Sequence, residues 1–302
     1  MLHELVLASL TLSDEGVRRL VVAIKAEGGA LRALEELAVL QNEGSRLDPL
    51  LEALTSGEAP CARTLRGMEI GGASTYSLDA VASFFTRGLG MGRLPLLSKL
   101  VLYQEAASPE SWARLIRALS TLAERGTQSR LETLTMNHST LKVDCLDALT
   151  PVFAAGGLPR LTHLEIGGDT FKAHPSTSFP EAWAKLGDKI WLEGLTLMTT
   201  VSRDLVVRIR DAIIRLAFCP YLRRIYLDMN VNLGMNAIDV RKMRRDLVAT
   251  MEGRGLTPLE FVARLDAAEA PLRAEEIKER RTSCFSKPAS AGFQQMDSDG
   301  DY

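Results

Sequence analysis

The sequence predicts an α/β solenoid built from about eight strand–helix units. Three observations predict this fold. A six-residue template, apolar-x-x-apolar-x-apolar, occurs eight times between residues 2 and 227, its copies begin 30 to 34 residues apart, and helical patterns fill the intervals. A single hexamer of this kind is common by chance, but eight copies in register indicate a repeat architecture.

Each copy of the template predicts a short strand. Its last two apolar positions alternate with outward residues, as expected of a strand that turns one face toward a core. The hexamers are LHELVL from Leu2, LEELAV from Leu34, LRGMEI from Leu65, LSKLVL from Leu97, LETLTM from Leu131, LTHLEI from Leu161, LEGLTL from Leu192 and LRRIYL from Leu222.

Helix signals follow several of these strands. Residues 13–29 begin with a serine N-cap and acidic residues, and they end at paired glycines. Residues 108–126 place Pro109 at the first helical position and gather apolar side chains on one face. We therefore expect each unit to be a strand, a loop and a helix that returns to the next strand.

Two further helices are predicted in the second half of the chain. Residues 178–187 contain Ser178 and, three residues later, Glu181, a spacing typical of a capping box. Residues 202–218 repeat Leu, Ile, Ile and Leu at helical spacing. These segments extend the alternation of strands and helices to the eighth strand.

Stacking explains why such units would fold together. One strand–helix unit cannot bury its own apolar face, so each apolar ladder must pack against the next, and the core becomes continuous. Parallel strands would line a concave face. Helices are wider than the strand spacing, so they would spread on the convex face and impose curvature.

The repeats resemble those of leucine-rich-repeat proteins, most closely the long-repeat, ribonuclease-inhibitor-like class. The family pattern is L-x-x-L-x-L-x-x-N-x-L, and its first three apolar positions match in all eight units. The resemblance implies a right-handed horseshoe with strands on the concave face and helices on the convex face. The family's asparagine, which hydrogen-bonds neighbouring turns, matches at two positions only. The residues at this position are Leu10, Asn42, Ala73, Glu105, Ser139, Asp169, Thr200 and Asn230.

We divide the chain into a solenoid over residues 1–255, a C-terminal helical cap over 256–281 and a disordered tail over 282–302. An amphipathic helix is expected over 236–255, and Thr257 with Pro258 begins the cap. Leu2 already belongs to the first ladder, so the first unit is either an exposed edge or continues a longer solenoid. In the tail, RRTS at 280–283 resembles a kinase target with Ser283 as acceptor, although a solvated helix end explains it as well.

Bulk composition excludes several classes of protein. The net charge of −2 argues against a general nucleic-acid binder. No apolar run is long enough to span a membrane. The N-terminus lacks the basic leader of a signal peptide, so we do not expect secretion. The four cysteines form no CxxC pair, so free thiols and a cytoplasmic location are expected.

Motifs for chemistry are weak throughout. The segment EIGGDT at 165–170 resembles the start of a phosphate-binding loop, yet EIGGAS at 69–74 occupies the same register and the other units place unrelated residues there. We interpret it as a turn in which Gly167 and Gly168 permit unusual backbone angles. The histidines lack metal-ligand spacing, and Glu69 and Glu165 lie three units apart, too far for a carboxylate pair. We expect no enzymatic activity, metal, cofactor or small-molecule substrate.

The outward strand positions are the remaining candidates for function. We expect a protein–protein interaction module whose concave face binds a partner, with no nucleic acid or membrane involved. The alternatives are a regulator of another enzyme, GTPase-activator-like or nuclease-inhibitor-like, and a structural segment of a larger receptor or sensor. Aromatic side chains on such a face are typical binding anchors. The predicted partner-binding residues are Glu36, Lys99, Tyr103, Thr133, Asn137, His163, Glu165, Arg224 and Tyr226.

Overall fold

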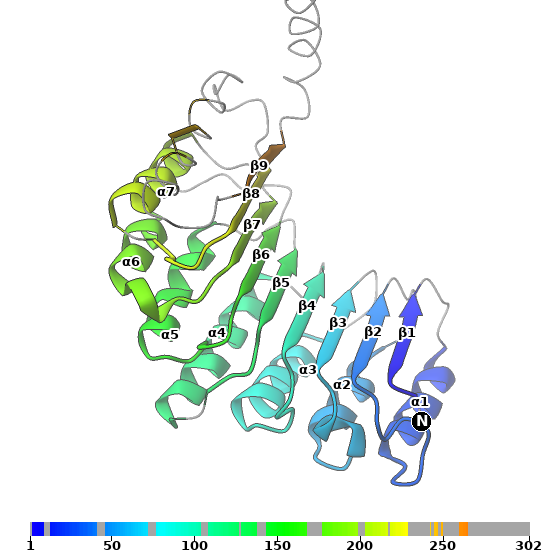
Figure 1. Cartoon of the computed structure of the whole chain (residues 1–302). Helices are drawn as coiled ribbons and strands as arrows, with labels where there is room; N and C mark the ends of the chain where they lie inside the picture. Colours follow the sequence, from blue (N-terminus) through cyan, green and yellow to red (C-terminus); the bar gives the residue numbers. More distant parts are fainter. Residues whose placement is uncertain are drawn as a thin grey trace, which may run out of the picture.

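One parallel sheet runs through the described part of the computed structural model (Figure 1). The structure describes residues 2–8, 13–40, 46–71, 77–103, 108–126, 128–137, 143–167, 177–198, 203–216, 218–228 and 260–264, with 242, 245–246 and 249. In that part of the chain nine strands pair in sequence order, each parallel to the next. They are β1 (Glu4–Ala8), β2 (Glu36–Leu40), β3 (Gly67–Gly71), β4 (Lys99–Tyr103), β5 (Thr133–Asn137), β6 (His163–Gly167), β7 (Gly194–Met198), β8 (Arg224–Asp228) and β9 (Glu260–Arg264).

Helices connect the strands and lie together on one side of the sheet (Figure 1). Short 3-10 turns at Pro60–Arg63, Val143–Leu149 and Gly187–Lys189 complete some connections, and a π-type segment, Phe84–Gly90, continues the third helix. The alternation of parallel strands with helices is compatible with a repeat solenoid. The helices are α1 (Asp14–Lys25), α2 (Asp48–Thr55), α3 (Leu78–Ser83), α4 (Pro109–Glu124), α5 (Thr150–Ala154), α6 (Phe179–Leu186) and α7 (Arg203–Leu216).

The register of the sheet matches the register of the sequence template. Each of the eight predicted hexamers overlaps one of β1–β8, and the first strand residues align from Glu4 to Glu36 and onward to Arg224. The backbone pairing begins one residue earlier: the amides of Glu35 and Glu36 both donate to the carbonyl of His3, and each later step repeats this pattern. The predicted outward columns therefore run straight across the strands.

The apolar ladder forms a continuous core between the sheet and the helices. Its residues in β2–β8 are almost completely buried, in agreement with the prediction. Helix α4 buries Trp112, Leu115 and Leu119 against this core, as its periodicity predicts. The ladder comprises Leu37, Val39, Met68, Ile70, Leu100, Leu102, Leu134, Met136, Leu164, Ile166, Leu195, Leu197 and Ile225.

Helix caps agree with the sequence at two helices and differ at a third. Ser13 and Ser108 accept hydrogen bonds from backbone amides at the starts of α1 and α4. The predicted capping box of α6 is wrong, because Ser178 makes no side-chain cap. Its amide instead donates to Asp147 of the preceding unit at 2.9 Å, so the cap comes from the neighbouring repeat.

The ninth strand corrects the prediction at the C-terminal end. Residues 260–264 pair with β8 as β9, where the sequence predicted a helix of the C-terminal cap. Thr257 and Pro258, which supplied the helix-start signal, lie outside the described residues, as do Ser283 and the rest of the tail. In the register of β9 the template positions hold Pro258, Phe261 and Ala263, so proline at the first apolar position and alanine at the last hid this copy.

No described helix is long and apolar enough to cross a membrane. The asparagine positions of the repeat pattern all lie outside the described residues, so their hydrogen bonds stay a prediction.

Candidate functional site

The helices cover one face of the sheet and leave the other uncovered (Figure 1). By strand alternation, all nine residues predicted to bind a partner belong to the uncovered face. We call it the open face and define it by the first, third and fifth residues of β1–β8. Three rows cross it. The first holds Glu36, Lys99, Thr133, His163 and Arg224, the second Glu165 and Tyr226, and the third Tyr103 and Asn137.

A charge network joins β2, β3 and β4 on the open face. Lys99 donates to the carboxylate of Glu69 at 2.5 Å, and this bond raises the pKa of Lys99. The carboxylate of Glu36 lies over Gly67, where any side chain would collide with it, and it interacts electrostatically with Lys99. Burial raises the pKa of Glu36, and Glu69 adds to this while Lys99 opposes it. The positive charge of Lys99 thus partly offsets the negative charges of both Glu36 and Glu69.

Two glycines at strand ends make room for the side chains of β4 and β5. Tyr103 lies against Gly71 of β3, and Asn137 lies against Gly167 of β6. A Cβ on Gly71 would be 2.5 Å from the Cβ of Tyr103, and one on Gly167 would be 2.9 Å from the Cγ of Asn137. Tyr103 and Asn137 are register neighbours, but their side chains lean in opposite directions. Tyr103 leans toward β3 and Asn137 toward β6.

This arrangement corrects our interpretation of the EIGG segments. The sequence predicted that Gly167 permits an unusual backbone angle, but its backbone dihedral lies outside the left-handed region. Gly167 leaves room for the side chain of Asn137, which a Cβ at this position would push aside. Gly168 lies outside the described residues.

Glu165 occupies the middle of the open face on β6. It is half-buried, and its carboxylate makes no hydrogen bond or ion pair with another described residue. Burial raises the pKa of its carboxyl group. Its register neighbour Thr135 is 7% exposed, and Val101 beyond it is 4% exposed. The centre of the open face therefore combines a nearly buried floor with a desolvated carboxylate.

Tyr103 connects this carboxylate to the charge network electrostatically. Burial raises the pKa of its phenol, and the negative charges of Glu69 and Glu165 add to the shift. Both carboxylates are thus close enough to influence one hydroxyl group. The predicted residues on β8, Arg224 and Tyr226, lie two strands beyond Glu165.

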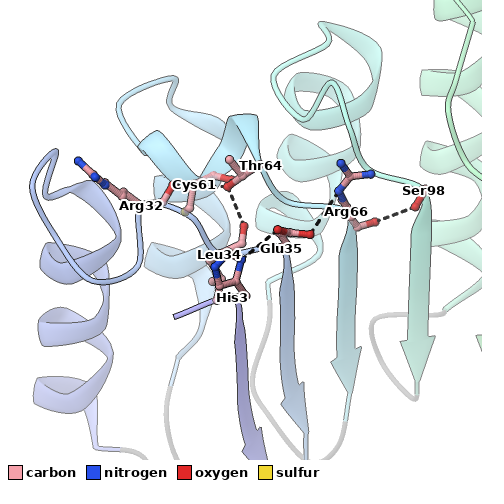
Figure 2. A network of polar contacts seen from close by, with 8 residues as sticks. All are labelled: His3, Arg32, Leu34, Glu35, Cys61, Thr64, Arg66 and Ser98. Carbon is pink, nitrogen blue, oxygen red and sulfur yellow. Dashed lines mark hydrogen bonds and ion pairs between the residues drawn. The ribbon is translucent and has the colours of Figure 1, made fainter. Parts of the chain in front are cut away.

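A second polar network follows the amino ends of the strands, beside the open face (Figure 2). Glu35 accepts from His3 at 3.0 Å and forms an ion pair with Arg66 at 3.4 Å. Ser98 donates to the carbonyl of Arg66 at 3.4 Å. This row was not predicted, because its residues occupy the variable second position of each hexamer and form no motif, although their equivalent placement is visible in the repeats.

Thr64 fixes the turn before β3 within the same network (Figure 2). Its hydroxyl donates to the carbonyl of Leu34 in the preceding unit at 2.8 Å. It also lies 3.1 Å from the carbonyl of Cys61. This part of the network therefore ties one repeat to the next and has a structural role.

Trp191 and Tyr221 form an exposed aromatic pair just before β7 and β8. Their rings stack with centroids 4.4 Å apart and planes 5° apart. Both occupy the position immediately before the first leucine of their template. The sequence analysis missed the pair because it considered only aromatic residues on the strands themselves.

Comparison with known proteins does not assign the chain to a family. No protein-family model matches the sequence, and no curated protein matches it significantly. Among the described residues, no group of three or more His, Cys, Asp or Glu side chains could hold a metal ion.

Proposed function

We propose that this chain is a leucine-rich-repeat protein, ribonuclease-inhibitor-like in its long repeats, that binds a protein partner on its open face. The parallel sheet, the single helical layer and the repeat spacing support the family assignment. The open face would then be the concave face of a right-handed horseshoe. In this architecture, the side chains exposed on the strands determine what the protein binds.

The half-buried carboxylate of Glu165 is the observation that carries the proposal. A carboxylate that loses solvent without gaining a partner costs free energy. Its neighbours Tyr103 and Asn137 can donate or accept hydrogen bonds, and Tyr103 adds apolar area. A partner that supplies a donor to Glu165 would recover the lost hydration, so this position favours recognition over stability.

Matched variants of the open face and the helical face test the proposal. The open-face variant combines His163→Ala, Glu165→Gln and Tyr226→Ala. The control combines Glu110→Gln, Arg117→Ala and Glu124→Gln, because these α4 side chains are exposed on the other face. Each is immobilised and used to capture proteins from cells of the native source.

The expected result is that the wild-type and control chains retain the same partner while the open-face variant loses it. Equal capture by all three chains would contradict the proposal. Circular dichroism of each variant verifies that the fold is retained.

We also propose a cytoplasmic location. Among the described residues, Cys61, Cys145 and Cys219 form no disulfide, as expected in a reducing compartment. Fluorescence microscopy of the tagged chain in its native source tests this, and an extracellular signal would contradict it.

A further inference from the structure

The first unit of the sheet is much less buried than the others. Leu5 and Leu7 of β1 are only partly buried, although the equivalent ladder residues of β2–β8 are at most 1% exposed. Leu2 is 43% exposed, whereas its equivalents in the other units are at most 3% exposed. The apolar ladder therefore remains partly open at β1.

Helix α1 continues this apolar surface on the helical side of the sheet, where the ladder residues also point. It stands at the end of the row of helices, beyond α2 (Figure 1). Leu20 and Val21 are partly buried against the core, and Val22 is 69% exposed. An exposed edge strand beside exposed apolar residues is a template for association with another chain.

The sequence of β1 is complementary to itself in an antiparallel register. If two copies of ELVLA pair about Val6, Leu5 lies opposite Leu7 of the second copy and Val6 lies opposite Val6. Glu4 lies opposite Ala8, so the two carboxylates do not face each other. Residues that lie opposite each other in an antiparallel pair point to the same face of the sheet. The leucines of the two copies therefore meet on the core side, and the two Val6 side chains meet on the open face.

The charges of α1 suit the same two-fold arrangement. Its first turn carries Asp14 and Glu15, and its last turn carries Lys25; within the chain Glu15 pairs with two arginines of α1, and Lys25 pairs with Glu58. A two-fold axis perpendicular to the sheet makes the two α1 helices antiparallel, so the acidic end of one approaches the basic end of the other. Opposite helix dipoles add to this attraction.

We propose that two copies of this chain associate through β1 and α1, with β1 pairing antiparallel to β1 and Val6 on the two-fold axis. The sheet then continues through the interface with both open faces on the same side. Leu2, Leu5 and Leu7 gain the burial that their equivalents already have. Edge-to-edge pairing of this kind is self-limiting because the axis closes the assembly.

Disulfide trapping tests the register directly. In an antiparallel pair, opposed Cα atoms lie about 4.5–5.5 Å apart, within disulfide range. Val6→Cys therefore places two thiols opposite each other across the axis. Glu4→Cys is the matched control, because its two thiols are offset by about 13 Å along the strands.

On mild oxidation of the full chain, Val6→Cys is expected to give a covalent dimer on non-reducing electrophoresis, while Glu4→Cys and wild type give none. Equal cross-linking of both variants, or none by Val6→Cys, would overturn the proposed register. The native cysteines are present in all three proteins, so wild type measures their background.

Sedimentation equilibrium tests the association itself. Wild type is expected to be a concentration-dependent dimer, and Val6→Lys raises its dissociation constant about tenfold or more, because like charges meet on the axis. Met198→Lys changes an exposed apolar residue of the same face far from β1 and leaves the constant unchanged. A wild-type monomer at every concentration, or a larger assembly, would refute the dimer.

Discussion

The carboxylate of Glu36 lies directly above Gly67 of the neighbouring strand. This position brings it toward Lys99 on the next strand, and Lys99 already pairs with Glu69. Glycine at this register position is the reason that a side chain from β2 can reach a residue of β4. A similar relationship holds for Tyr103 above Gly71, but there the contact involves the base of the side chain.

Substituting these two glycines by alanine should therefore have different effects. At Gly67 the new methyl group displaces only the far end of Glu36, so we expect a change in unfolding free energy within about 0.5 kcal/mol. At Gly71 the methyl meets the Cβ of Tyr103 at 2.5 Å, and the strands must shift. We expect a loss of about 1–3 kcal/mol, measured by chemical denaturation. Equal effects of both substitutions would contradict this explanation.

The sequence predicted the strands and their register because both follow from one local pattern. The apolar template places inward and outward residues together, so the row from Glu4 to Arg224 could be aligned before the structure was known. The roles of Gly67 and Gly167 could not be predicted, since they depend on which neighbouring side chain leans over them. Register identifies neighbours, but rotamers decide the direction in which each side chain leans.

Two further errors arose from contacts between units. The capping box of α6 was predicted within one helix, but Asp147 from the preceding unit supplies the cap. The ninth strand was missed because Thr257 and Pro258 are ordinary helix-start residues and Ala263 weakens the strand pattern. In both cases packing against the neighbouring repeat overrides a local preference.

Asp147 should contribute more to stability than Ser178. Its carboxylate accepts from the amide of Ser178 at 2.9 Å and from the hydroxyl at 3.2 Å. Asp147→Ala removes both bonds and should lower the unfolding free energy by about 1 kcal/mol. Ser178→Ala keeps the amide bond and should cost about half as much or less. Chemical denaturation of both variants measures the two losses of unfolding free energy. A larger loss for Ser178→Ala than for Asp147→Ala would support the capping box instead.

Glu165 and Glu181 should respond to pH with opposite signs. Burial raises the pKa of Glu165 above its ordinary value of 4.5, so its ionisation destabilises the fold as pH rises through the raised pKa. Glu165→Gln should therefore stabilise the chain near neutral pH by only about 0.5 kcal/mol, because the half-exposed carboxylate is still screened by solvent. The difference should vanish below pH 4.5, where the carboxyl group is protonated in both states.

Glu181 provides the matched control on the helical face. Its hydrogen bonds with Arg208 lower the pKa of Glu181, so its contribution is complete above 4.5 and is lost as pH falls through the lowered pKa. Glu181→Gln should destabilise the chain by about 0.5 kcal/mol near neutral pH, since the pair is partly exposed. Denaturation across pH measures both differences, and shifts of equal sign would contradict the assigned environments.

The stack of Trp191 on Tyr221 should couple the seventh and eighth units measurably. The rings lie 4.4 Å apart and nearly parallel, yet the residues are 47% and 40% exposed, so neither depends on the core for its position. A double-mutant cycle of Trp191→Ala and Tyr221→Ala should give a coupling of about 0.5–1 kcal/mol in unfolding free energy. Tyr221→Phe preserves the ring and should retain most of this coupling. A cycle that closes to zero would mean that the rings adjoin without stabilising the two units, because additivity is the behaviour of independent sites.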